Sequence, residues 1–354
     1  NSQENRESKS CKIHMLKNKF WIVVPAVLIV LLIGFFGFRR WGLRDSSSDR
    51  EQMLSLMPVD SGAVVFIDLA DLRSTPFFQQ LLGWAPKPSV DTDYAQFLHE
   101  TGFNFETDLD RLAVSVRRQP QGMSAFAIAE GRFDRKKIET YGSQFGALKT
   151  ADGRTLFAVP LTESHRKVYF TFLRDNRIAW ANDSAYFFQR PTEGSLAEWR
   201  ERFARLGGTP IFAVLRQDSE AAAALAQQAP GGMHSPQLAA LLAQLNWISI
   251  SAKPDGDLLR VGMEGECVAE STEHQLKDLL SGLIVMAQMG LNDPKTQKKL
   301  DPALREGYAQ LLKSAEIQQV DRGTSKSVRA VFDVTPKLLE AAESSAADTV
   351  KSAH

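Results

Sequence analysis

An uncharged apolar run from Phe20 to Phe38, FWIVVPAVLIVLLIGFFGF, constrains this chain more than any other feature. A helix of this length would be roughly 28 Å long at ~1.5 Å per residue, close to the ~30 Å hydrocarbon core of a bilayer. Pro25 is tolerated in such a helix because neighbouring groups can satisfy the carbonyl that it frees. A buried helix of a soluble core is rarely apolar on every face over such a length. The run therefore predicts one transmembrane helix over residues 20–38.

The residues on either side of this run predict an uncleaved signal anchor. Met15 opens a short basic segment before the run and has the position of a natural start, and the FFGFRRWG sequence at its end has no small-x-small cleavage site. The flanking positive charges almost balance, but a basic head before an apolar run favours an amino terminus in the cytoplasm. We therefore expect a single-pass membrane protein that contacts the lipid bilayer through residues 20–38, with its folded part outside the cytoplasm.

The composition of the remaining chain is that of an ordinary folded protein. Roughly 310 residues follow the run, enough for one large domain or two of ordinary size. Lys plus Arg and Asp plus Glu both number 42, so the net charge is zero and nucleic acid is not an expected partner. Cys11 and Cys267 lie on opposite sides of the apolar run, which excludes a disulfide framework.

Hydrophobic patterning predicts the same order of elements twice: a strand, a helical region, two strands, a helix and two strands. In the first half the expected strands are 63–67, 112–116, 123–133, 156–161, 168–173 and 177–181, with helices over 77–98 and after Asp134. In the second half we expect a strand within 209–221, a helix over 236–245, a hairpin over 246–267, a helix that a capping box at Thr272 and Gln275 opens, and a strand pair over 315–334.

This order predicts the α+β fold class: an N-terminal transmembrane helix followed by a duplicated, mostly antiparallel sheet-plus-helix ectodomain. The expected divisions are an N-terminal tail (1–19), the transmembrane helix (20–38), a polar linker (39–55), a first α+β repeat (56–190), a connecting helix or linker (191–208), a second α+β repeat (209–336) and a C-terminal tail (337–354).

Three segments carry a resemblance to a class of proteins: LMPVDSGAVVFIDLADLRSTP (56–76), DLDRLAVSV (108–116) and AEGRFD (129–134). They resemble single-pass bacterial membrane proteins of uncharacterised families, in which an anchor precedes duplicated α+β domains of unknown function. The resemblance covers most of residues 55–335. It implies an architecture only, because the matching motifs are strand ends and helix caps, and it implies no catalytic residue.

Side chains that could carry chemistry are scattered along the sequence. The six histidines (His14, His99, His165, His234, His274 and His354) have no metal-ligand spacing. Asp108 and Asp110 could hold calcium but are more typical of a solvated turn, and Cys267 is typical of an inert packed thiol. Glu264 and Glu266 share one face of a strand, which we interpret as the polar outer face of a half-exposed sheet. We therefore expect a protein that is not an enzyme and that holds no cofactor or metal.

Aromatic residues concentrate in the first half of the chain. They are Phe77, Phe78, Trp84, Tyr94, Phe97, Phe103 and Phe105. The favoured interpretation is that they pack a helix pair onto a sheet, and the alternative is an apolar groove for a lipid-like ligand or a partner helix. Our leading functional hypothesis is a non-enzymatic protein for envelope organisation or protein–protein contact, with a protein partner or oligomer. Binding of a hydrophobic ligand by the aromatic-rich first repeat is the alternative hypothesis.

Overall fold

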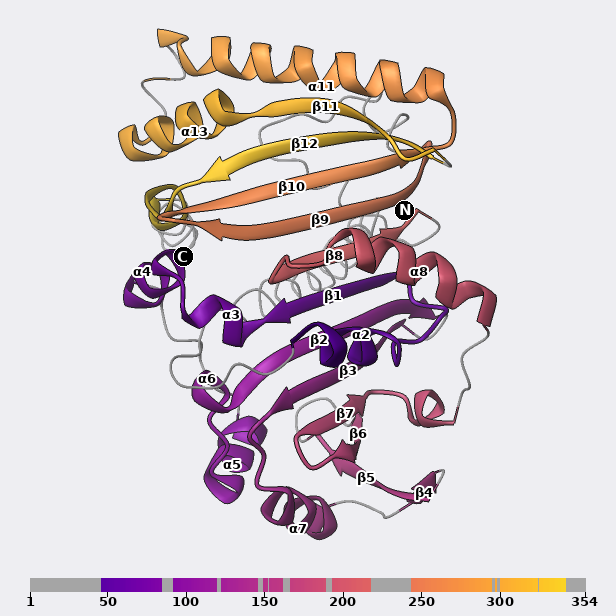
Figure 1. Ribbon diagram of the computed structural model, residues 1–354. Coiled ribbons are helices and arrows are strands. Elements are labelled where there is room, and N and C mark those ends of the chain that lie inside the picture. Colours follow the sequence, from indigo (N-terminus) through magenta and orange to yellow (C-terminus); the bar gives the residue numbers. More distant parts are fainter. Residues whose placement is uncertain are drawn as a thin grey trace, which may run out of the picture.

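The computed structural model consists of one large antiparallel sheet with helices on both of its faces (Figure 1). It describes residues 46–84, 92–119, 122–145, 149–151, 153–161, 166–188, 193–217, 243–294, 297, 300–323 and 325–341. These residues form a 12-stranded sheet in the order β11-β12-β10-β9-β8-β1-β2-β3-β7-β6-β5-β4. Every pair of neighbouring strands is antiparallel, which is typical of an α+β fold built from hairpins.

The described strands and helices alternate in groups along the chain. The strands are β1 (Ala63–Asp68), β2 (Leu109–Gln119), β3 (Gly122–Gly131), β4 (Lys149–Ala151), β5 (Arg154–Pro160), β6 (Lys167–Arg174), β7 (Arg177–Ala181), β8 (Ile211–Arg216), β9 (Leu245–Asp255), β10 (Leu258–Cys267), β11 (Glu316–Asp321) and β12 (Lys326–Val334). The helices are α2 (Ser46–Leu54), α3 (Leu69–Arg73), α4 (Pro76–Trp84), α5 (Thr92–Thr101), α6 (Phe105–Asp108), α7 (Arg135–Phe145), the 3₁₀ helix η1 (Ser184–Phe187), α8 (Glu193–Arg205), α11 (Glu270–Leu291) and α13 (Pro302–Ser314).

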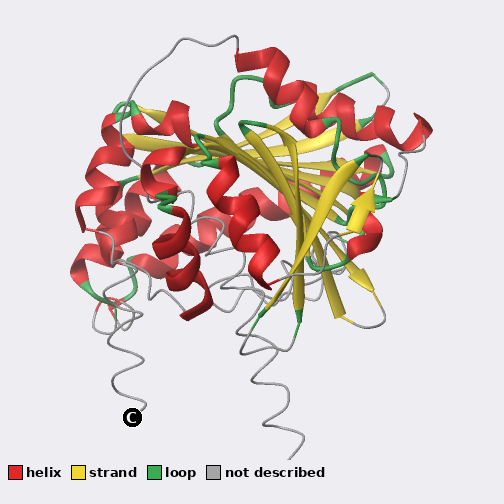
Figure 2. Cartoon of the chain, turned by 90° about the horizontal axis from the view of Figure 1, so that it is seen from below, coloured by secondary structure: helices red, strands yellow, loops and turns green. Residues whose placement is uncertain are grey.

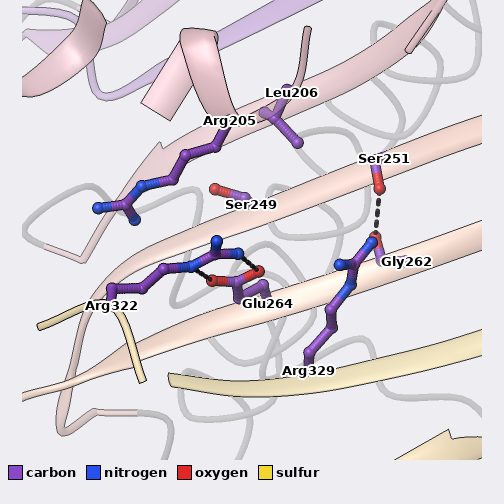
Figure 3. Close-up of a pocket in the computed structure, with 8 residues that line it drawn as sticks. All are labelled: Arg205, Leu206, Ser249, Ser251, Gly262, Glu264, Arg322 and Arg329. Atoms are coloured by element: carbon purple, nitrogen blue, oxygen red, sulfur yellow. Dashed lines mark hydrogen bonds and ion pairs between the residues drawn. The ribbon is translucent and has the colours of Figure 1, made fainter. Parts of the chain in front are cut away.

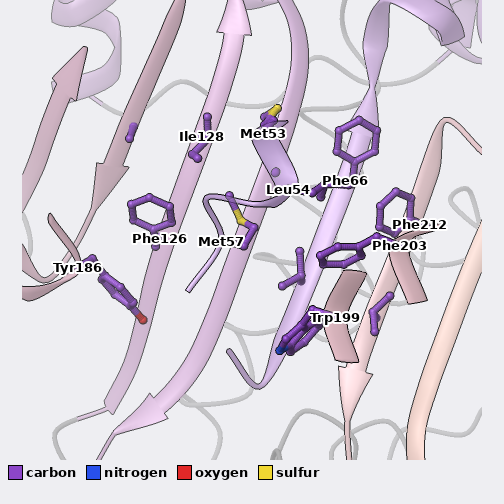
Figure 4. Packing of buried hydrophobic residues seen from close by; sticks show 14 of the residues in the cluster. Met53, Leu54, Met57, Phe66, Phe126, Ile128, Tyr186, Trp199, Phe203 and Phe212 are labelled. Atoms are coloured by element: carbon purple, nitrogen blue, oxygen red, sulfur yellow. The ribbon is translucent and has the colours of Figure 1, made fainter. Parts of the chain in front are cut away.

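One face of the sheet, here called the α8 face, is covered by α2, η1 and α8. Met53 of α2, Tyr186 of η1, and Trp199 and Phe203 of α8 pack on the apolar residues at the centre of the sheet (Figure 4). The rings of Phe66 on β1 and Phe212 on β8 stack there with centroids 5.1 Å apart. This cluster joins the two central strands to the helices that precede them, so it is the main core on this face.

The opposite face, here called the α7 face, is covered by α3, α4, α5, α7, α11 and α13. Ile138 of α7 packs with Phe157 and Phe170, whose rings stack at 4.9 Å, and Leu276 of α11 packs against Val328 of β12. Figure 2 shows the strongly twisted sheet with helices on both sides. Because both faces are largely covered, most strands are buried on both sides, in keeping with their long apolar runs.

The strands on the two sides of the central β1/β8 pair follow the same order. Counted outward, one side is β1-β2-β3-β7-β6 and the other is β8-β9-β10-β12-β11, with β5 and β4 added beyond β6. Val65 and Ala213 face each other in the middle of the central pair. An approximate twofold axis perpendicular to the sheet at this point brings α2 onto α8 and α7 onto α11, each on its own face. Positions on the two sides can therefore be compared residue by residue.

The expected fold, a transmembrane helix followed by a duplicated sheet-plus-helix ectodomain, is wrong as a whole, and only its α+β class agrees with the structure. The α+β class holds, but the described strands form one continuous sheet across the middle of the chain rather than separate repeated sheets. No helix in the described part of the chain is long and apolar enough to cross a bilayer. The run at residues 20–38 and the tails at 1–19 and 342–354 lie outside the described residues. Most predicted strands and the helices after Asp134 and over 272–290 are confirmed.

Two local expectations are also wrong. The segment that we read as a polar linker, 39–55, contains α2, because Met53 and Leu54 at its end are buried against the sheet. The capping box is absent because α11 begins earlier, at Glu270, and the hydroxyl of Thr272 donates a hydrogen bond to Gln244 at 2.8 Å. Most of the helix expected over 236–245 lies outside the described residues.

Candidate functional site

A ladder of alternating charges crosses four strands of the α8 face. Asp68, Arg111, Glu130 and Arg177 are direct cross-strand neighbours on β1, β2, β3 and β7. Arg111 donates to Asp68 at 2.9 Å and to Glu130 at 3.1 Å, and Arg177 donates to Glu130 at 2.6 Å and to Gln52 of α2 at 3.2 Å. Burial lowers the pKa of Arg111, but the charges and hydrogen bonds of the two carboxylates outweigh burial and raise it. Because each charge is paired, the ladder is a structural network.

A second buried glutamate, Glu266, occupies the equivalent position on the other side of the sheet. It lies between Trp247 and Ser327 in its cross-strand ladder, as Glu130 lies between Arg111 and Arg177. Its partners come from α8 and not from the sheet: Arg202 donates to one of its oxygens and Arg205 donates to the other at 2.8 Å.

The sequence interpretation of Glu264 and Glu266 is therefore half right. The two side chains share one face of β10, as the alternation predicts, but this face is not the solvated outside of the sheet. Glu266 is only 4% exposed because α8 lies over it, and Glu264 is bound by Arg322. The arginines that cover these carboxylates come from segments far away in the sequence, which local patterning does not reveal.

A polar cleft of about 780 Å³ opens beside Glu266 at the end of β8. Its lining includes Arg202, Arg216 and Trp247, and the guanidinium carbon of Arg202 lies 4.0 Å from the Trp247 ring centroid. The cleft is lined by three glutamates and three arginines, among them Glu198 and Arg216, which lie 3.8 Å apart, so the charges of its lining balance. The chain continues from this cleft into residues 218–242, outside the described residues, and we assign no function to it.

A smaller hollow lies farther along the α8 face, between β9, β10 and β12 (Figure 3). We call it the serine–arginine hollow. It measures about 40 Å³ and is lined by Arg205, Leu206, Ser249, Ser251, Gly262, Glu264, Arg322 and Arg329. Arg322 binds both oxygens of Glu264, at 3.1 and 2.8 Å, and the hydroxyl of Ser251 donates to the carbonyl of Gly262 at 3.3 Å.

The surface of α11 carries an exposed apolar stripe. We call Gly282, Val285, Met286 and Met289 the methionine stripe. Val285, Met286 and Met289 are 54%, 59% and 69% exposed. The spacing of i, i+3, i+4 and i+7 places all four residues on one side of the helix. A neighbouring side of the same helix packs Leu279, Leu280 and Leu283 against the sheet.

The aromatic residues that we singled out in the first half mostly pack on one another. Phe77 and Phe78 are buried in the core of the α7 face. The rings of Phe97 and Phe103 lie 6.1 Å apart, and Tyr94 lies 6.2 Å from Phe105. The side chain of Trp84 lies outside the described part of the structure. Tyr94, Phe97, Phe103 and Phe105 are partly exposed, and an apolar groove at these residues stays a prediction.

The other residues considered for chemistry occupy ordinary positions. Asp108 accepts hydrogen bonds from the backbone of Asn104 and the hydroxyl of Thr107, and Asp110 pairs with Arg73 at 3.1 Å. His99 and His274 are exposed, and His14, His165, His234 and His354 lie outside the described residues. Burial raises the pKa of the Cys267 thiol to about 11. Among the described residues, no group of three His, Cys, Asp or Glu is placed to hold a metal ion.

Comparison with known proteins does not assign a function to this chain. No protein-family model matches the chain, and no curated protein matches its sequence. Among solved structures, crystal forms IV and III of TP0453 are similar with a TM-score of 0.39 each, at 8% and 10% identity. Both alignments cover 82% of this chain, and they cover 96% and 97% of TP0453. A TM-score of 0.39 is too low to infer a shared fold or function.

Proposed function

We propose that this chain is a non-enzymatic protein that acts through protein–protein contact, with the methionine stripe as its contact surface and a second copy of the chain as its partner. The observation that carries the proposal is the exposure of Val285, Met286 and Met289 on one side of a helix whose other side is already packed. Clustered exposed apolar side chains mark interaction sites more often than scattered ones do.

The sequence of α11 divides the helix into two unlike parts. The first part, up to Asp278, places polar and charged residues such as His274 toward solvent. From Leu279 to Leu291 the helix has no charged residue, and its polar side chains, Ser281 and Gln288, lie seven residues apart on one side. Besides the side that faces the sheet, this part has an exposed apolar side of Val285, Met286 and Met289, so the second part of α11 is suited to burial against a further surface.

The shape of the methionine stripe favours packing against the methionine stripe of a second copy of the chain. If two α11 helices lie antiparallel about an axis between Val285 and Met286, each Met289 falls opposite Gly282 of the other copy. A long side chain then meets a position with no side chain, and among the described residues nothing outside the helix itself lies within 4 Å of where a Cβ atom of residue 282 would be. The absence of charge along the stripe also removes like-charge repulsion between the copies. Such self-complementarity is what a twofold interface requires.

The mass of the full chain in solution tests this proposal. We expect light scattering after gel filtration to give a dimer at micromolar concentration. We expect a variant with both Met286→Glu and Met289→Glu to dissociate at least about 100-fold more readily, because each buried methionine contributes about 1.5–3 kcal/mol. The matched control is Met263→Glu, since Met263 is 38% exposed on β10, outside the stripe. A wild-type chain that stays monomeric, or a stripe variant that stays dimeric, would overturn the proposal.

A further inference from the structure

Arg329 stands apart from the other arginines of the serine–arginine hollow. Glu264 is its direct cross-strand neighbour, yet both oxygens of Glu264 are taken by Arg322. Within the part of the chain that the structure describes, Arg329 makes no ion pair or hydrogen bond. Figure 3 shows its guanidinium group beside Gly262, at the opposite end of the hollow from the Arg322–Glu264 pair. Among the described residues, no carboxylate pairs with this half-buried positive charge in the hollow.

The equivalent positions on the other side of the sheet have no such polar hollow. The ladder Val214–Ser249–Glu264–Arg329 corresponds to Phe66–Ala113–Ile128–Ala179 across the approximate twofold axis. In the latter ladder, Phe66, Ala113, Ile128 and Ala179 all belong to the apolar core beneath α2. The same fold thus fills this place with apolar side chains in one half and leaves a polar hollow with a free cation in the other. Close packing at this place is therefore compatible with the fold, and the hollow is a property of these particular residues.

We propose that the serine–arginine hollow binds a small oxyanion, a carboxylate or a phosphate group, with Arg329 as its charged contact. A guanidinium group presents parallel N–H donors that match both kinds of oxyanion, and the hydroxyl group of Ser249 adds a further donor, whereas that of Ser251 already donates to the Gly262 carbonyl. A volume of about 40 Å³ suits one anionic group and not a large organic ligand.

Gly262 keeps the floor of the hollow open. A Cβ atom at this position would lie 2.9 Å from the hydroxyl oxygen of Ser251 and 3.6 Å from an Nη atom of Arg329. A Gly262→Ala substitution therefore shifts the serine hydroxyl and narrows the hollow without altering any charge. It tests the shape of the site separately from its charge.

Calorimetric titration of the full chain tests the proposal, with inorganic phosphate and acetate as separate probes at constant ionic strength. We expect one saturable site for at least one of these anions, and the preferred anion distinguishes a phosphate site from a carboxylate site. Arg329→Gln should weaken binding at least tenfold, and Arg329→Lys should retain part of the affinity because it keeps the charge but loses the planar fork. Gly262→Ala should weaken binding as well.

The matched control is Arg260→Gln, because Arg260 is an exposed arginine of the same sheet that does not line the hollow. It should bind the anion as the wild-type chain does. Thermal melting of each variant reports whether it is folded, and Arg329→Lys provides a charged alternative if Arg329→Gln does not fold. The proposal is overturned if neither probe gives a saturable signal with the wild-type chain, or if Arg329→Gln binds with wild-type affinity.

Discussion

Glu130 and Glu266 occupy equivalent positions on the two sides of the central β1/β8 pair, and each is buried and bound by two arginines. Glu130 takes its partners, Arg111 and Arg177, from neighbouring strands, whereas Glu266 takes Arg202 and Arg205 from α8. The two halves of the sheet thus compensate a buried carboxylate in different ways. Removing a partner from either carboxylate should therefore change the free energy of unfolding by a different amount in each half.

Replacing Arg177 with alanine should destabilise the protein strongly. The side chain is 2% exposed, and its loss leaves Glu130 buried with only one of its two arginines. Breaking a buried ion pair in this way typically costs about 3–5 kcal/mol, measurable as a lower midpoint of urea denaturation. The control is Arg135→Ala, which removes exposed ion pairs with Glu139 and Asp175 and should cost less than about 1 kcal/mol. Equal losses in the two variants would show that the ladder has no structural role.

Glu130→Gln should cost more stability than Glu266→Gln. The first substitution removes the negative charge that Arg111 and Arg177 share. Their side chains are only 11% and 2% exposed, so water cannot replace this charge by solvating them. The second leaves Arg202 and Arg205 beside an open cleft, where water can solvate Arg205. Urea denaturation of both variants under the same conditions compares the two costs. The reverse order would contradict this account of the two carboxylates.

Local patterning of the sequence predicts the strands well because their residues alternate or form short apolar runs. It does not predict how strands from the two halves join, since the β1/β8 pairing connects residues such as Val65 and Ala213 that lie far apart in sequence. Local patterning also predicts a linker in place of α2, because the segment is polar over most of its length. Its helix is packed through Met53 and Leu54 at its end.

The candidate sites were less accessible to sequence analysis than the fold. Arg329 has no partner among the described residues because Arg322 binds Glu264, which no spacing of residues reveals. The methionine stripe did have a signal in the sequence, because residues 279–291 include no charge on either side of the helix. Comparing the two halves of each predicted helix would have found this stripe.

Gly142→Ala should destabilise the protein although alanine favours helices. Gly142 lies in α7, and a Cβ atom there would come within 2.6 Å of the Phe170 ring and 2.9 Å of the Phe157 ring. Overpacking of this kind typically costs about 1–3 kcal/mol and exceeds the gain of up to about 1 kcal/mol in helix propensity. The control is Gly290→Ala in α11, where no described residue outside the helix lies within 4 Å of the added Cβ atom and the change should be neutral or stabilising. Equal melting temperatures for the two variants would contradict the packing of α7.

The thiol of Cys267 should resist modification in the folded protein. Burial raises its pKa from the ordinary value of 9.0 to about 11, so the thiolate is scarce at pH 8. In a Cys11→Ser background, a chromogenic disulfide reagent should react with Cys267 only after denaturation. Because the pKa is higher in the folded state, the contribution of this thiol to stability is complete below pH 9 and declines as the pH rises through about 11. Rapid reaction of the native thiol at pH 8 would exclude this description.

The distance between spin labels on two copies of α11 tests the proposed self-association most directly. A label at His274, an exposed position before the methionine stripe, can be introduced as His274→Cys after Cys11 and Cys267 are replaced by serine and alanine. In the antiparallel pair the two labels are separated by about 35 Å along the helix axis, from ~1.5 Å per residue on each side of the twofold axis. A parallel pair would place them about 10 Å apart. Pulsed dipolar spectroscopy of the full chain should give the longer distance, and the short distance or no intermolecular coupling would contradict the account.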